Sequence, residues 1–119
     1  MVHVLYLEDE PNDAQLVERY LKSVADTITL RVARDIPAAE LALAEEPSLV
    51  LVDIMIGNAR SGLEFVRTLR DDGYHMDVIA ITALTLPREI EQCLESGCSV
   101  VITKPFSIGE LDRVLSQYL

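Results

Sequence analysis

Short apolar runs recur along this chain, and segments whose apolar residues repeat at helical spacing lie between them. The runs are shorter than a typical helix and are bounded by charged or turn-forming residues, which predicts buried strands. The alternation of the two patterns predicts a repeated strand–helix unit. The predicted strands cover residues 2–7, 28–32, 49–52, 78–81 and 99–102.

Proline, glycine and serine mark the ends of the predicted helices. Pro11 and Pro37 open the first two, since proline is favoured in the first turn of a helix. Gly97 follows the fourth helix, where a positive φ is often needed. Ser107, with Glu110 three residues later, predicts a capping box before the last helix. The predicted helices cover residues 11–24, 37–44, 63 to about 73, 87–96 and 108–118, and residues 57–62 are expected to form a loop.

Five strands that alternate with five helices predict an α/β fold with a doubly wound, five-stranded parallel sheet. In the second strand, Thr29 and Arg31 alternate with apolar residues, so this strand is expected at an edge. An edge position for the second strand favours the flavodoxin-like strand order 2-1-3-4-5. Ligands of such sheets bind beyond the carboxyl ends of the strands, near the switch point between strands one and three.

Length and charge exclude several classes of protein. A chain of 119 residues is expected to form one domain, here residues 1–119. Its net charge of −10 disfavours binding to nucleic acid or to an anionic membrane surface. Two cysteines make no disulfide framework, and no apolar run approaches the roughly 18 residues of a membrane span. With no targeting segment evident, we expect a cytoplasmic protein.

Polar residues follow the predicted strands at one edge of the sheet. Glu8 and Asp9 follow the first strand, Asp53 the third, Thr82 the fourth and Lys104 the fifth. Three crowded carboxylates repel one another unless a cation lies among them. Hard oxygen ligands without histidine or cysteine favour Mg²⁺, or Mn²⁺ in its place. The sequence therefore predicts a divalent cation held by Glu8, Asp9 and Asp53.

A carboxylate beside such a cation can act as a nucleophile and form an acyl phosphate. We assign this role to Asp53. The Lys104 ammonium and the Thr82 hydroxyl are then suited to bind oxygens of the transferred phosphoryl group. These are the parts that a phosphoryl-accepting aspartate needs.

Over essentially its whole length, the chain resembles the receiver domains of two-component response regulators. The resemblance rests on four motifs in order, which are Glu8-Asp9 in LYLEDE, Asp53 in LVLVDIM, Thr82-Ala83 in ITA and Lys104-Pro105 in TKPF. It implies that the backbone carbonyl of Met55 joins the metal ligands, that Glu8 acts through water, and that the Lys104–Pro105 peptide is cis.

The resemblance also implies a phosphorylation-controlled signalling switch. A sensor histidine kinase or a histidine phosphotransfer protein would supply the phosphoryl group to Asp53. The domain would catalyse its own phosphorylation and a slow dephosphorylation without being a conventional enzyme. A downstream protein, or a second copy, would bind the face formed by residues 87–96, 99–102 and 108–118.

Several positions depart from the family pattern. Gly57 stands where proline is frequent, and Val101 stands where an aromatic residue often serves as a rotamer switch. Conformational coupling is therefore expected to run through Thr82 and its neighbour Ala83, and through Lys104 and Pro105, with a readout that differs from the aromatic one. Ser99 and Val100 replace an acidic pair common in receivers that dimerise through the face described above.

Two apolar residues occupy positions that tune dephosphorylation in receivers, Met55 and Leu84. Neither side chain can orient an attacking water, so we expect slow self-hydrolysis. The predicted helix 87–96 has few apolar positions, mainly Ile90, Cys93 and Leu94. A helix anchored in this way is free to shift on phosphorylation, and a simple solvated face fits the pattern equally well.

Three other functions are weighed against this one. An aspartate-nucleophile phosphatase needs an acid two residues after the nucleophile, where this chain has Met55. A nucleotide carrier needs a glycine-rich phosphate loop after the first strand, where Glu8 and Asp9 would repel phosphate. The most serious rival is a degenerate receiver that binds proteins independently of phosphorylation, and Gly57 and Val101 leave room for it.

Overall fold

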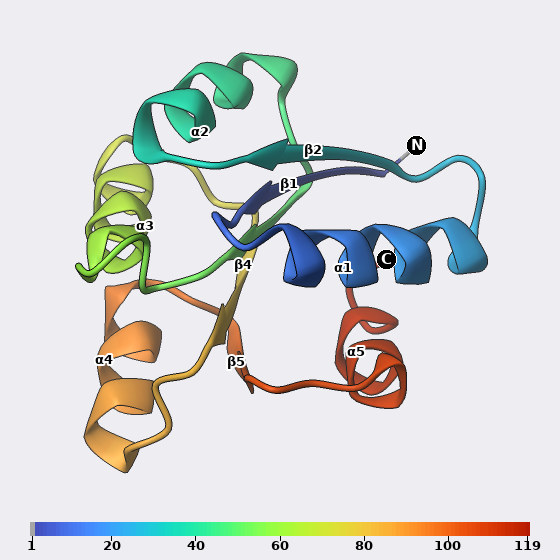
Figure 1. Ribbon diagram of the computed structural model, residues 1–119. Helices are drawn as coiled ribbons and strands as arrows, with labels where there is room; N and C mark the ends of the chain where they lie inside the picture. The colour runs from blue at the N-terminus through green and yellow to red at the C-terminus, as the bar shows by residue number, and fades with distance from the viewer. Residues whose placement is uncertain (1) are drawn as a thin grey trace.

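One sheet of five parallel strands runs through the molecule, and helices cover both of its faces (Figure 1). The structure is a computed structural model that describes residues 2–119. The strand order is β2-β1-β3-β4-β5, which confirms the predicted α/β fold and the order 2-1-3-4-5. The strands are β1 (His3–Leu7), β2 (Thr29–Ala33), β3 (Leu49–Val52), β4 (Asp77–Thr82) and β5 (Val100–Thr103).

Local capping residues set where several helices begin. Glu10 accepts a hydrogen bond from the Asn12 N–H at 3.0 Å, and Asp35 accepts one from the Ala38 N–H at 2.9 Å. Gly97 ends the fourth helix with φ 119°, a conformation that favours glycine. The helices are α1 (Pro11–Val24), α2 (Ile36–Ala42), α3 (Ser61–Asp71), α4 (Pro87–Ser96) and α5 (Ile108–Leu115), and a short 3₁₀ helix, η1 (Leu43–Glu45), follows α2.

Some helix boundaries differ from the predictions. The predicted helix 37–44 ends its α-helical part at Ala42, and the chain continues as η1 to Glu45. The α3 helix begins at Ser61, so the last two residues of the predicted loop 57–62 are helical. The α5 helix ends at Leu115, and the chain continues in turns toward Tyr118. Helix ends often tighten into 3₁₀ or turn geometry, which the apolar pattern of a sequence does not record.

The predicted capping box at α5 is formed only in part. Ser107 Oγ accepts a hydrogen bond from the Glu110 N–H at 3.1 Å, as predicted. The Glu110 carboxylate lies 3.3 Å from the Ser107 hydroxyl, where that hydroxyl can donate to it. The reciprocal bond of a complete box would instead run from the Ser107 backbone N–H to the Glu110 side chain.

Side-chain alternation along each strand divides the core between the two faces of the sheet. Val4 and Tyr6 of β1 pack on the side of α1 and α5. Leu5 and Leu7 pack on the other side, with α2, α3 and α4. Figure 1 shows the same division, with α1 and α5 on one side of the sheet and the other three helices opposite.

The β2 strand forms an edge of the sheet, as its alternating pattern predicts. Thr29 and Arg31 are exposed, while Leu30 and Val32, which alternate with them, are partly buried. Among residues 2–119, no helix combines the length and the apolar character needed to cross a membrane.

Candidate functional site

Two neighbouring strands bring the acidic residues together. Leu7 of β1 pairs with Val52 of β3, so Glu8, Asp9 and Asp53 follow directly at the same edge. One carboxylate oxygen from each of the three residues lies within 4.8 Å of the others. Glu8 and Asp53 are buried, whereas Asp9 is exposed. The three residues predicted to share a cation are therefore adjacent in space.

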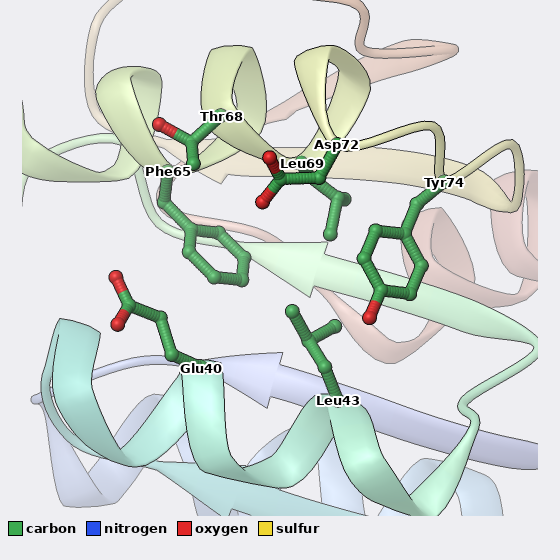
Figure 2. Close-up of a pocket in the computed structure, with 7 residues that line it drawn as sticks. All are labelled: Glu40, Leu43, Phe65, Thr68, Leu69, Asp72 and Tyr74. Carbon is green, nitrogen blue, oxygen red and sulfur yellow. The ribbon is translucent and has the colours of Figure 1, made fainter.

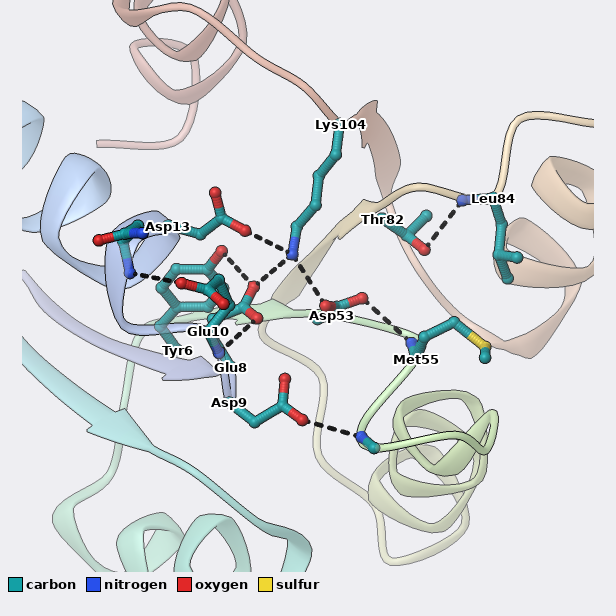
Figure 3. Close-up of polar contacts among 12 residues, drawn as sticks. Tyr6, Glu8, Asp9, Glu10, Asp13, Asp53, Met55, Thr82, Leu84 and Lys104 are labelled. Carbon is teal, nitrogen blue, oxygen red and sulfur yellow. Dashed lines mark hydrogen bonds and ion pairs between the residues drawn. The ribbon is translucent and has the colours of Figure 1, made fainter.

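Lys104, directly after β5, extends its ammonium group into this acidic cluster (Figure 3). Its Nζ lies 2.8 Å from Glu8 Oε2, 2.9 Å from Asp53 Oδ2 and 2.9 Å from Asp13 Oδ2. Burial disfavours the charged ammonium, but the hydrogen bonds to the three carboxylates outweigh it and raise the pKa of Lys104 above its usual value.

Glu8 is the most enclosed of the carboxylates, with a side chain that is 0% exposed. The Tyr6 hydroxyl donates to Glu8 Oε2 at 2.9 Å, and the Glu10 N–H donates to Oε1 at 3.1 Å. Burial raises the pKa of Glu8, and the neighbouring charge of Asp53 raises it further, while the bond from Lys104 opposes both. Burial and the adjacent Glu8 also raise the pKa of Tyr6, so its phenol stays protonated and remains a donor.

Asp53 is held at both of its carboxylate oxygens. Oδ1 accepts a hydrogen bond from the Met55 N–H at 3.0 Å, and Oδ2 accepts the one from Lys104. The backbone around Asp53 is packed tightly against the start of α3. A Cβ on Gly62 would lie 2.1 Å from the Asp53 carbonyl oxygen, so only glycine fits at this position without a shift of the backbone.

Gly57 anchors the loop after β3 to the acidic cluster. Its N–H donates to Asp9 Oδ2 at 2.8 Å, and its φ of 64° is one that favours glycine. A proline at position 57 would have no N–H to donate to Asp9. The departure from the family pattern therefore has a structural role, because it ties Asp9 to the loop that follows Asp53.

Thr82 lies apart from the ammonium-centred cluster. It is fully buried, and its Oγ1 accepts a hydrogen bond from the Leu84 N–H at 3.2 Å. Figure 3 shows it across Asp53 from Lys104. Ala83 is exposed, and Val101 is partly buried against the core on the α2–α4 side. The Lys104–Pro105 peptide is cis, as the resemblance implies.

Two members of the cluster were missed by sequence reasoning, Tyr6 and Asp13. Tyr6 lies within an apolar run and reads as a core residue, although its place two residues before Glu8 puts both side chains on one face of the strand. From the sequence, Asp13 is interpreted as an acidic residue that stabilises the first turn of α1. Its contact with Lys104 joins residues 91 positions apart, which local patterns do not reveal.

A cavity of about 310 Å³ lies elsewhere, between α2 and α3 (Figure 2). Its lining combines the apolar side chains of Leu43, Phe65, Leu69 and Tyr74 with the carboxylates of Glu40 and Asp72. It contains no residue of the acidic cluster, so the cluster is an open strand-end site separate from this cavity.

The cluster combines four carboxylates, those of Glu8, Asp9, Asp13 and Asp53, with one ammonium group. All of its anionic donors are oxygens, which is the donor set that Mg²⁺ and Mn²⁺ prefer. Such an excess of negative charge favours binding of a divalent cation. The residues present therefore fit the cation predicted from the sequence.

Comparison with known proteins agrees with this geometry. A family model for the response regulator receiver domain matches residues 4–116. The polar-differentiation response regulator DivK of Brucella anthropi is 32% identical over 118 residues, which cover 98% of this chain and 94% of DivK. DivK of Brucella ovis shows the same identity and coverage.

Solved structures give the same result. The BeF3-activated N-terminal receiver domain of Klebsiella pneumoniae RstA is 28% identical, has a TM-score of 0.84, and is matched over 98% of this chain and 97% of that one. The receiver domain of Francisella response regulator 1452 is 25% identical, with a TM-score of 0.86 and coverage of 99% and 96%.

Proposed function

This chain belongs to the family of response regulator receiver domains of two-component signalling, and we propose on that basis that Asp53 is its phosphoacceptor. The observation that carries the proposal is the set of contacts that hold the Asp53 carboxylate. One oxygen is held by the Met55 N–H and the other by the Lys104 ammonium, beside the carboxylates of Glu8 and Asp9. Its carboxylate is thus oriented next to a positive group at the ends of the strands.

The donor is the phosphohistidine of a sensor histidine kinase or of a histidine phosphotransfer protein. An Asp53 oxygen forms a bond to phosphorus while the phosphorus–nitrogen bond of phosphohistidine breaks, and the electron pair stays on the imidazole nitrogen. Lys104, 2.9 Å from Asp53 Oδ2, binds an oxygen of the transferred group, and the Thr82 hydroxyl donates to another.

Glu8, Asp9 and Asp53 would hold Mg²⁺ or Mn²⁺, with the backbone carbonyl of Met55 as a further oxygen ligand. When bound, the cation neutralises negative charge on the transferring phosphoryl group. Glu10 takes no part, because its exposed side chain caps the start of α1.

The phosphorylated state is propagated through the strand ends and helices that follow Thr82 and Lys104. Contact of these two residues with the phosphoryl group shifts the balance between two arrangements of the α4–β5–α5 face. Ala83 and Pro105 directly follow Thr82 and Lys104, and Val101 lies in β5, three residues before Lys104, so we assign these three residues to the conformational change. A downstream protein or a second copy of the domain binds this face in one state.

Self-hydrolysis of the acyl phosphate is slow. The side chains of Met55 and Leu84, two residues beyond Asp53 and Thr82, are apolar and cannot orient an attacking water. The decay of phosphorylated protein after removal of donor measures this directly. A half-life as short as that of fast-cycling receivers would contradict the proposed slow self-hydrolysis.

Incubation with Mg²⁺ and acetyl phosphate, followed by intact-protein mass spectrometry, tests the phosphoacceptor. We expect the wild-type protein to gain one phosphoryl group, and Asp53→Asn to gain none. Asp26→Asn, which makes the same charge change in an exposed turn, is expected to behave as wild type. Absence of the gain in folded wild-type protein would favour a phosphorylation-independent binding module, and a gain on Asp53→Asn would place the acceptor elsewhere.

A further inference from the structure

Three carboxylates surround the Lys104 ammonium, and they differ in their other contacts. Glu8 and Asp53 belong to the group of oxygens gathered within 4.8 Å, together with Asp9. Asp13 lies outside that group but contacts Lys104 at the same 2.9 Å as Asp53 does. Its side chain is 30% exposed, against 0% for Glu8 and 8% for Asp53. Asp13 is thus the outer partner of the ammonium (Figure 3).

Lys104 and a divalent cation would compete for two of these carboxylates. Both are positive, and both draw on the oxygens of Glu8 and Asp53. The ammonium and the cation would repel each other, because both are positive and water is partly excluded from the site. A cation that takes those oxygens therefore weakens the hold of Glu8 and Asp53 on the ammonium. Asp13, which lies outside the group of cation ligands, keeps its contact with the Lys104 ammonium.

We propose that Asp13 is a positioning residue of the phosphorylation site, which keeps the Lys104 ammonium in place when a divalent cation occupies Glu8 and Asp53. The inference rests on the proposed function and deepens it. Asp13 makes cation binding more favourable, because its ion pair with Lys104 persists when the cation takes the oxygens of Glu8 and Asp53. It also leaves the ammonium within the site, where it can bind an incoming phosphoryl oxygen.

A purely structural role for Asp13 makes a different prediction. As an acid in the first turn of α1, Asp13 would stabilise the helix through its N-terminal dipole. Its loss would then lower stability without changing cation affinity or the state of Lys104. An experiment that observes Lys104 directly therefore distinguishes the positioning role of Asp13 from the purely structural one.

The chain offers a direct probe, because it contains only two lysines, Lys22 and Lys104. Lys22 is 74% exposed and pairs with Glu18 on the surface of α1, so it serves as an internal reference for a solvated ammonium. In protein labelled with ¹³C and ¹⁵N lysine, NMR resolves one signal from each side chain. Titration with Mg²⁺ then reports cation affinity and the restraint of Lys104 together, without any phosphodonor.

In wild-type protein we expect Lys104 to stay distinct from Lys22 when Mg²⁺ is saturating. In Asp13→Asn we expect the Mg²⁺ dissociation constant to rise about two- to fivefold, as for loss of a partly exposed ion pair, and the Lys104 signal to move toward that of Lys22. Asp13→Glu, which keeps the charge, is expected to restore both features. Asp26→Asn, with the same loss of charge away from Lys104, is expected to match wild type.

Equal Mg²⁺ affinity and equal Lys104 signals in wild type and Asp13→Asn would overturn the inference. A wild-type Lys104 signal that becomes like that of Lys22 on addition of Mg²⁺ would also overturn it, as would the absence of Mg²⁺ binding. Failure of the phosphoacceptor proposal appears separately, because it is read by mass spectrometry after acetyl phosphate treatment of wild type and Asp53→Asn.

Discussion

Glu8 illustrates how hydrogen bonds offset part of the cost of burying a single carboxylate at the end of a strand. It is enclosed, yet it receives hydrogen bonds from the Tyr6 hydroxyl, the Glu10 N–H and Lys104. Each of these donors stabilises the anion against the cost of removing it from water. The Tyr6 bond is the one that lies deepest, because Tyr6 itself is fully buried within β1.

Replacement of Tyr6 by Phe removes one donor from Glu8 and keeps the ring in the core. We expect the free energy of unfolding to fall by about 1.5–3 kcal/mol, the usual worth of a hydrogen bond to a charged group. Urea denaturation with an unchanged m-value measures it. Tyr118→Phe is the control, since that residue packs against the same side of the sheet and its hydroxyl has no hydrogen bond among residues 2–119. Equal losses in the two variants would contradict the role given to Tyr6.

Gly62 gives a second prediction at the level of one residue. A methyl group there would lie 2.1 Å from the Asp53 carbonyl oxygen, so Gly62→Ala must displace the backbone that carries Asp53. We expect a loss of about 1–3 kcal/mol in unfolding free energy, typical of overpacking, together with slower phosphorylation.

Gly109→Ala provides the matched control for Gly62→Ala. Gly109 also lies in the first turn of a helix, but its nearest neighbour to an added Cβ is 3.8 Å away. This variant is expected to gain a few tenths to about 1 kcal/mol, because alanine favours helix more than glycine does. A Gly62→Ala protein as stable as Gly109→Ala would show that α3 does not press on Asp53.

The sequence allowed Glu8, Asp9, Asp53 and Lys104 to be predicted as neighbours because each directly follows a strand of a parallel sheet. Their adjacency depends on topology alone and not on side-chain detail. The contact of Asp13 with Lys104 depends on how α1 sits above the strand ends, and no spacing in the sequence records that. Residues that follow strands were therefore predictable, while Asp13, which reaches the site from a helix, and Tyr6, which lies within an apolar strand, were not.

Among the elements, α4 is attached to the molecule through few contacts. Its buried residues are Cys93 and Ser96, three positions apart on one face. Leu94, predicted to pack, is 47% exposed, because one residue further along a helix turns the side chain about 100° away from Cys93. The apolar count predicted a thinly held helix, but it could not fix which side faces the core.

Arg60 adds a polar attachment between the loop after Asp53 and α4. Its guanidinium lies 3.0 Å from Glu89 Oε2 and 3.0 Å from Gln92 Oε1. Because the Arg60 side chain is 47% exposed, we expect Arg60→Ala to cost only about 0.2–1 kcal/mol. The effect should be concentrated in α4, as faster amide hydrogen exchange there. Arg88→Ala, an exposed change in the same helix, is the control, and equal exchange in both variants would argue against the attachment.

The first and last helices are joined through a buried tyrosine. The Tyr20 hydroxyl on α1 donates to Asp112 Oδ1 on α5 at 3.0 Å. Burial, together with the hydrogen bond and the charge of Asp112, raises the pKa of Tyr20 to about 12 from its ordinary value of 10.0. The folded state thus holds this proton more tightly than the unfolded state does.

This shift has a defined consequence at alkaline pH. The contribution of Tyr20 to stability is fully present below pH 10.0 and is lost as pH rises toward about 12. Urea denaturation between these values should therefore show a steeper loss of stability in wild type than in Tyr20→Phe. Parallel curves for the two proteins would contradict the raised pKa.

At the scale of the whole molecule, the parallel sheet determines where chemistry can occur. The alternation in β2 and the solid apolar runs of β1, β3 and β4 were enough to predict the strand order, because edge and central strands differ in the surface they bury. The side of the sheet on which each strand-end residue falls was not predicted. The position of Thr82, apart from the contacts of Lys104 with Glu8 and Asp53, becomes clear only once the pairing of the strands is known.

The net charge of the chain also becomes informative only when the positions of the charges in the fold are known. A net charge of −10 disfavours several classes of partner but identifies no site. Glu8, Asp13 and Asp53 contact one ammonium group at the strand ends, and Asp9 lies beside Glu8 and Asp53. This local excess of negative charge favours binding of a divalent cation. The position of these charges in the fold carries more functional information than their number.

Amide NMR with beryllofluoride, a phosphoryl mimic, is the most direct test of Asp53 as a Mg²⁺-dependent phosphoacceptor. In the presence of Mg²⁺, we expect wild-type signals to shift around Asp53, Thr82 and Lys104 and along α4, whereas Asp53→Asn should show no such shifts. Unchanged wild-type spectra, or identical shifts in Asp53→Asn, would contradict the proposal that Asp53 is the phosphoacceptor.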